Sequence, residues 1–88
     1  MDLLVVVDLV ASFEEWKAVF DGDAEARSAF MASWLVGQTD ENKAMILAYG
    51  VDVPAMAAFM GTPEFAEKTD PYMSGVTIYT LSEMERPA

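Results

Sequence analysis

The stretch LLVVVDLV at residues 3–10 decides the fold, because apolar residues occupy both alternating sets of positions along it. A strand with one wet face alternates apolar and polar residues, so this strand is expected to be covered on both faces. A chain of 88 residues is too short to provide a second covering layer by itself. The sequence therefore predicts that a second copy of the chain covers one face, which makes the protein a homodimer.

Composition indicates a single domain spanning residues 1–88, with 53% hydrophobic residues and an acidic surface. Fifteen acidic residues outnumber five basic ones, and the formal net charge is -10. Such a charge repels the phosphates of nucleic acids and of anionic membranes. We therefore expect neither nucleic acid nor a membrane among the partners.

The chain contains no cysteine and no histidine. This composition excludes disulfides, thiolate catalysis, a Ser-His-Asp triad, imidazole zinc sites and a haem held by a proximal histidine. The acidic turns lack the spacing of an EF-hand loop. We accordingly expect no cofactor and no metal. No basic segment precedes the first apolar run, and that run is too short to span a bilayer, so a cytoplasmic location is expected.

Capping signals place the helices. Ser12 followed by Glu15 forms a capping box, which predicts a helix from Phe13. The acidic turn at 21–23 interrupts it, and helical structure is expected to resume to about Phe30. Asp52 and Thr62 are expected to cap two further helices, each with a proline in its first turn. The first of these two helices is expected to end at Gly61, and the second at the Asp-Pro pair at 70–71.

Further strands are predicted at 32–38, 43–51 and 76–81, with a polar tail at 82–88. The first two form a hairpin around the polar turn at 39–42. The resulting order is βαββαβ, whose usual solution is a four-stranded antiparallel sheet with the helices on one face. The sequence therefore predicts an α+β, ferredoxin-like subunit with one bare sheet face, through which two subunits form a dimeric α/β barrel.

Strand parity predicts where a pocket lies. If the odd-numbered set with Val7 faces the partner, then Val6 and Asp8 face the helices. An apolar stripe on the first helix, with Trp16 and Phe20, would bound the same pocket. Trp34 and Tyr49 are further candidates for its aromatic wall.

Two charged residues are candidates for chemistry in that pocket. Asp8 is a carboxylate within an apolar strand, so it could act as a general base, or it could simply lie in a wet crevice or pair with a cation. Arg27 could hold a carboxylate or enolate oxygen of a ligand. Ordinary helix-surface pairing is the alternative: Arg27 with Asp23, and likewise Lys68 with Glu64.

The order and spacing of several positions resemble small dimeric α/β-barrel proteins related to the antibiotic-biosynthesis monooxygenases. The matching segments are Val10-x-x-Phe13-x-x-Trp16-Lys17-x-x-Phe20-Asp21, Arg27, Asp40-x-Asn42 and Phe59-x-x-x-Pro63-Glu64-Phe65. The resemblance covers nearly the whole chain and is greatest to uncharacterised members. It implies two ferredoxin-like subunits packed sheet on sheet, each with a small pocket between helices and sheet. Many relatives carry His where this chain has Asp8, so haem-linked and His-dependent activities are not expected.

Three functions follow as hypotheses. The first is an uncharacterised homodimer that binds a small apolar or aromatic molecule between its helices and its sheet. The second is a cofactor-independent monooxygenase, isomerase or cyclase, with Asp8 as base and Arg27 or a tyrosine stabilising an oxyanion. The third is a dimerisation module without a ligand, which is favoured if Phe30, Met31 and Trp34 fill the pocket completely.

Overall fold

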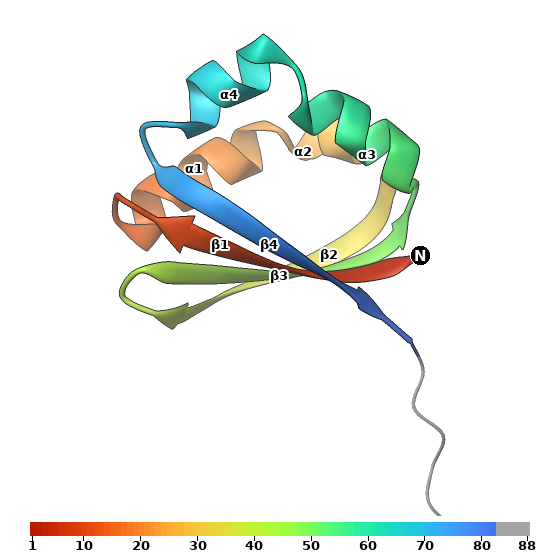
Figure 1. Ribbon diagram of the computed structural model, residues 1–88, viewed down its shortest axis with the longest axis horizontal. Coiled ribbons are helices and arrows are strands. Elements are labelled where there is room, and N and C mark those ends of the chain that lie inside the picture. Colours follow the sequence, from red (N-terminus) through yellow and green to blue (C-terminus); the bar gives the residue numbers. More distant parts are fainter. Residues whose placement is uncertain (83–88) are drawn as a thin grey trace, which may run out of the picture.

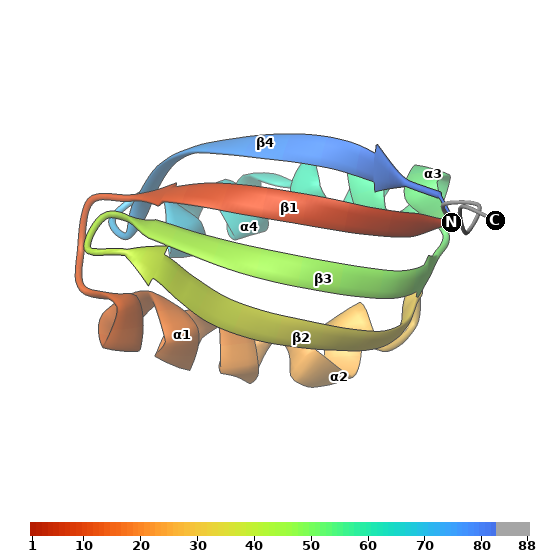
Figure 2. The ribbon, with the colours of Figure 1, turned by 90° about the horizontal axis from the view of Figure 1, so that it is seen from below.

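The computed structural model describes residues 1–82, so residues 83–88 of the tail predicted at 82–88 lie outside the described residues. Four antiparallel strands form one sheet in the order β2-β3-β1-β4. Their bounds are β1 Asp2–Leu9, β2 Met31–Asp40, β3 Lys43–Val51 and β4 Met73–Leu81. Figure 2 shows that one face of this sheet carries no helix.

Four helices lie on the other face of the sheet, in two consecutive pairs (Figure 1). Their bounds are α1 Phe13–Gly22, α2 Ala24–Arg27, α3 Val53–Met60 and α4 Pro63–Thr69. The elements follow the predicted βαββαβ order, with each helical segment divided in two. The predicted α+β, ferredoxin-like subunit is confirmed, whereas assembly into a dimeric barrel stays a prediction.

Short side-chain caps begin three of these helices where the sequence indicates. The hydroxyl of Ser12 accepts from the Glu15 amide at 3.1 Å, Asp52 accepts from the Ala55 amide, and Thr62 accepts from the Phe65 amide. Asp23 differs: it precedes α2 but makes no side-chain cap. Its carboxylate is therefore free for another contact.

Two boundaries differ from the predictions by more than two residues. Helix α2 ends at Arg27 rather than near Phe30, because the chain turns there with the Phe30 amide donating to the Arg27 carbonyl. Strand β4 begins at Met73, since Gly75 continues the strand opposite Asp8 instead of starting it. An irregularity in the β1–β4 register lies next to this pair.

The subunit core lies between the sheet and the helices. In β1 the odd-numbered residues are buried, and Val7 is only 2% exposed. Alternate residues of β3, namely Ala44, Ile46 and Ala48, are buried beside them. The predicted parity, in which the odd-numbered set faces a partner subunit, is therefore wrong. Hydrophobicity could not decide the orientation because both sets are apolar.

Gly50 changes this alternation at the end of β3. It has a φ of 59°, a left-handed conformation that suits glycine. Ala48 and Val51 are consequently both buried, although they lie three residues apart. A Cβ at Gly50 would also lie 2.8 Å from the Cβ of Ala32 on β2. The position therefore requires glycine for two reasons.

Within the described residues, no helix is long and apolar enough to cross a membrane.

Candidate functional site

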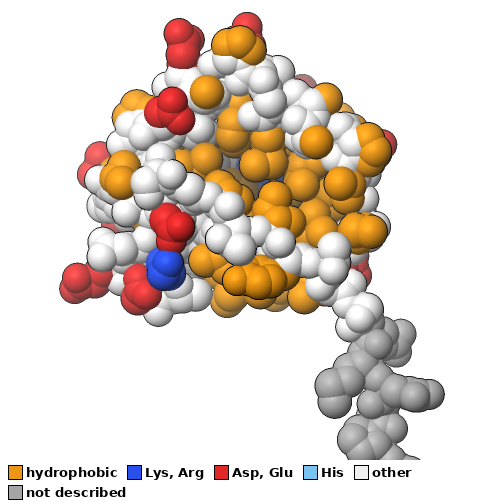
Figure 3. All heavy atoms as spheres, in the orientation of Figure 1, with side chains coloured by type: hydrophobic (Ala, Val, Ile, Leu, Met, Phe, Trp, Pro, Cys, Tyr) orange, Lys and Arg blue, Asp and Glu red, His pale blue; other side chains and the backbone are white. Residues whose placement is uncertain are grey.

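A cavity of about 90 Å³ lies between the helices and the covered face of the sheet. Figure 3 shows hydrophobic side chains gathered around this hollow. Its wall takes residues from both helix pairs and from all four strands, and it includes Val7, Met31, Ile46 and Val76 of the sheet. This volume accommodates several water molecules, since one water needs about 10–15 Å³.

Aromatic rings build much of the cavity wall. On α1, the Trp16 ring stacks on Phe20 with centroids 5.2 Å apart. On the opposite side, Phe59 of α3 contacts Phe65 of α4 at 5.3 Å, and Phe30 contacts Phe59 at the same distance. These pairs favour a flat apolar occupant, because such a molecule presents faces and edges that match the rings.

Only three of the lining residues are polar: Asp23, Arg27 and Thr69. The Thr69 hydroxyl is satisfied, since it donates to the Phe65 carbonyl at 2.8 Å. The other two carry opposite charges: Asp23 lies between α1 and α2, and Arg27 is the last residue of α2. The charges near the cavity are therefore concentrated on one side.

Arg27 is held by α1 and by two rings. Its side chain is buried, and Nη1 donates to the Phe20 carbonyl at 2.7 Å, near the end of α1. The guanidinium carbon lies 3.5 Å from the centroid of the Phe20 ring and 4.2 Å from that of Trp34. The two rings meet at 88°, so the cation occupies the angle between them.

This guanidinium is incompletely satisfied. Nε and Nη2 of Arg27 are buried and have no hydrogen-bond partner among residues 1–82. Burial lowers the pKa of Arg27, and the nearby charges of Asp23 and Asp21 act in the opposite direction. Arginine remains charged at neutral pH despite such a shift, so the cavity wall holds a cation with spare donors.

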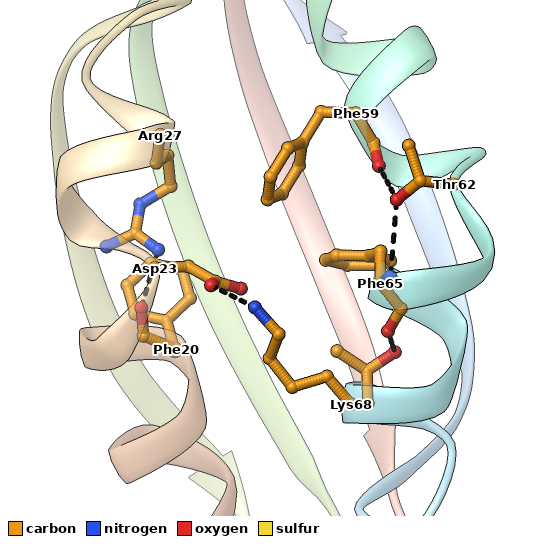
Figure 4. Close-up of polar contacts among 8 residues, drawn as sticks. Phe20, Asp23, Arg27, Phe59, Thr62, Phe65 and Lys68 are labelled. Atoms are coloured by element: carbon orange, nitrogen blue, oxygen red, sulfur yellow. Dashed lines mark hydrogen bonds and ion pairs between the residues drawn. The ribbon is translucent and has the colours of Figure 1, made fainter.

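The expected helix-surface ion pairs do not form. Asp23 Oδ1 accepts from Lys68 Nζ at 2.6 Å, across 45 residues of sequence, and no ion pair joins Asp23 to Arg27 within the described residues. Figure 4 shows this contact joining the α1–α2 side of the cleft to α4. Lys68 thus pairs with Asp23, the carboxylate that helical spacing had assigned to Arg27. It does not pair with Glu64, its own expected partner.

The structure separates Asp8 from the cavity. Asp8 lies on the helix-free face, and Lys43 Nζ donates to it at 2.5 Å. The hydrogen bond and charge of Asp8 raise the pKa of Lys43. Val6 and Tyr49 lie on the same helix-free face, because they alternate with buried residues of β1 and β3. The predicted placement of these three residues in the pocket is wrong.

Other predicted site residues do come together. Trp16, Phe20 and Arg27 are in the cavity wall, whereas Trp34 lies beside Phe20 and Arg27 without lining the cavity. Their roles in binding or catalysis stay predictions.

Sequence reasoning missed the contribution of α3 and α4 to the wall. The wall residues from these helices are Met56, Phe59, Met60, Phe65 and Thr69. The signal was present, because α3 is apolar around most of its circumference. Sequence reasoning also missed Val5 and Val7, since the assigned strand parity was reversed.

Among residues 1–82, no three His, Cys, Asp or Glu side chains gather into a group that could hold a metal ion.

No protein-family model matches the sequence, and no curated protein matches it. Solved structures do resemble the chain. SnoaB, a cofactor-independent oxygenase from Streptomyces nogalater, has a TM-score of 0.67 at 13% identity, covering 94% of this chain and 93% of that chain. A proposed antibiotic biosynthesis monooxygenase from Caulobacter crescentus has a TM-score of 0.60 at 18% identity, covering 96% and 89%. Another from Deinococcus radiodurans has a TM-score of 0.55 at 16% identity, covering 100% and 99%.

At these identities the likeness is one of fold. It confirms, at that level, the resemblance drawn from the sequence: the chain has the fold of SnoaB and of these two proposed antibiotic biosynthesis monooxygenases.

Proposed function

We propose that the protein binds a small, largely apolar or aromatic molecule in the cavity between its helices and its sheet. The observation that carries this proposal is an apolar, ring-lined cavity that retains an unsatisfied guanidinium in its wall. Small-molecule sites commonly combine apolar walls with a few converging polar groups.

The rival role, a dimerisation module without a ligand, requires the cavity to be filled by its own side chains. Phe30 and Met31 lie in the wall instead of closing the cavity, and Trp34 lies outside it. Packing alone would favour a filled interior, because protein cores reach the density of organic crystals. The remaining space supports the ligand-binding role.

Titration with neutral aromatic compounds, from benzamide to 2-naphthamide, tests the proposal. We expect saturable changes in the amide NMR signals of α1, α3 and α4. Val19 lines the cavity and Ala18 beside it is exposed, so the two make a matched pair. Val19→Phe should abolish the saturable change by filling the cavity, and Ala18→Phe should preserve it. Absence of saturation with every compound, or equal binding by both variants, would contradict the proposal.

We also propose that the protein is a homodimer. The two subunits would join through the uncovered face, defined as the helix-free side of the sheet. Its apolar residues are Leu4, Val6, Leu35, Met45, Leu47, Tyr49, Tyr79 and Leu81. Leu35 is 61% exposed and Tyr79 is 50% exposed in the single chain. A contiguous apolar surface of this kind is typical of a protein interface. Light scattering should give twice the 9.6 kDa chain mass.

Catalysis is a second candidate, favoured by the fold shared with a cofactor-independent oxygenase. Fold alone does not define chemistry. Asp8, the hypothesised base, lies away from the cavity, so an oxygenase reaction would depend on a substrate that ionises readily beside Arg27. Oxygen consumption with electron-rich hydroxynaphthalenes tests this candidate. Uptake that is lost in Val19→Phe would support it, and no uptake above the protein-free rate would contradict it.

A further inference from the structure

The charges around the cavity are unevenly paired. The carboxylate nearest to Arg27 in helical spacing, Asp23, is neutralised by Lys68 on α4. Arg27 receives one carbonyl hydrogen bond and two ring contacts, but no carboxylate partner within residues 1–82. Lys68 therefore pairs with the Asp23 carboxylate, whereas Arg27 forms no ion pair within these residues. Arg27, the buried cation, is therefore the one that lacks a carboxylate partner among them.

A buried cation without a counterion is costly, because water no longer solvates it. Its attraction for an anion is correspondingly greater than at the surface, since the surrounding dielectric constant is lower. Nε and Nη2 add two adjacent donors, which match the two oxygens of a carboxylate.

We infer that the natural ligand is an organic acid with an aromatic or similarly flat apolar body, whose anionic oxygen pairs with Arg27. This inference rests on the proposed function and specifies its ligand class. The rings of Phe59 and Phe65, opposite Arg27 in Figure 4, would contact the apolar body. The acid group would supply the counterion that Asp23 does not.

Access to the donors requires a local movement. Nε and Nη2 are enclosed in the unliganded chain, and the Phe20 ring lies against the guanidinium. Rotation of the Arg27 side chain or of the Phe20 ring would expose them to the cavity. Because Trp34 also contacts the guanidinium, binding should change tryptophan fluorescence.

Lys68 has a specific part in this scheme. By holding Asp23 at 2.6 Å, it keeps that carboxylate from forming an ion pair with Arg27. Removing Lys68 would free Asp23 to pair with the guanidinium and would therefore lower the affinity for an anion. Lys17 is a control of equal charge, because it pairs with Asp21 on the exposed surface of α1.

The experiment compares two ligands of the same shape, 2-naphthoate and neutral 2-naphthamide, by calorimetry at pH 7. We expect the parent protein to bind the acid at least tenfold more tightly than the amide. Arg27→Gln should reduce this preference to twofold or less, with Arg27→Lys between the two. Equal affinity of the parent protein for both ligands would overturn the inference and leave the proposed function intact. Failure of both ligands to bind would overturn both.

Variants around Arg27 keep the test decisive if Arg27→Gln fails to fold. Lys68→Met should lower the acid preference at least threefold, whereas Lys17→Met should lower it less, because Asp21 acts on Arg27 more weakly than Asp23 does. Asp23→Asn should raise it, because a competing carboxylate is removed. Equal losses in the two lysine variants would indicate general surface electrostatics and would overturn the assignment to Arg27. An unchanged preference in both Lys68→Met and Asp23→Asn would do the same.

Discussion

The two faces of the sheet are both apolar, yet helices cover only one of them. On the covered face, Val5 and Val7 contact side chains from the helices and line the cavity. On the uncovered face, Leu4 and Val6 are only partly buried, and Asp8 pairs with Lys43 near the strand end. Val5 and Val7 thus belong to the subunit core, whereas Leu4 and Val6, their neighbours on the same strand, belong to the proposed interface.

This difference teaches that hydrophobicity along a strand does not by itself reveal which of its faces the helices cover. The charged residue is the more informative one. A carboxylate tolerates the rim of an interface, where a lysine can reach it, more readily than a helix-covered core. Asp8 therefore indicates that the even-numbered residues of β1 lie on the uncovered face, contrary to the pocket role predicted for it.

The largest effect is expected for Val7→Asp. Val7 is 2% exposed, so the variant places an unpaired charge in the core at a cost of about 3–5 kcal/mol. That is a large part of the 5–15 kcal/mol typical of a whole domain. Circular dichroism should show extensive unfolding at 25 °C. A folded variant with normal urea resistance would contradict the assigned parity.

Val6→Asp tests the other face at the neighbouring position. Val6 is partly exposed in the single chain, opposite Met45 and Thr77. The added charge should dissociate the proposed dimer while the chain keeps its strand and helix content. Light scattering at several concentrations measures the mass, and Val6→Thr serves as a neutral control. A Val6→Asp protein that remains dimeric would place the interface elsewhere.

Gly50→Ala tests the point where the alternation of β3 changes. A left-handed conformation with a side chain costs about 1–3 kcal/mol, and the Ala32 contact adds to it. Urea unfolding should show the loss. Gly22→Ala is the matched control, since a Cβ there meets nothing within 4 Å. Equal stability of the two variants would contradict the account of Gly50.

Asp8→Ala should have the smallest effect, because the ion pair it removes is substantially exposed. Its hydrogen bond raises the pKa of Lys43, so its small contribution is present below the ordinary lysine pKa and is lost as pH rises through the raised value. Urea midpoints of variant and parent at neutral and strongly alkaline pH measure this. Binding of 2-naphthamide should be unaffected. A clear loss of binding would restore Asp8 to the site.

The sequence predicted some of the residues in the cavity wall and missed others. Trp16 and Phe20 were placed correctly because helical spacing defines one stripe on α1. Asp8 and Val6 were misplaced together, because a single reversal of parity moves every residue of a strand to the other face. Tyr49 was misplaced on another strand, β3, for which no parity was predicted. The Asp23–Lys68 contact could not be foreseen, since it joins elements 45 residues apart.

The amino-acid sequence by itself determined the element order, the helix starts and the apolar character of both faces of β1. These properties depend on local capping, on turn residues and on the periodicity of apolar side chains, which neighbouring residues fully encode. Only the tertiary structure decided which face the helices cover and which carboxylate Lys68 neutralises. Those outcomes depend on how distant helices and strands meet, and the burial of Arg27 without a counterion arises only there.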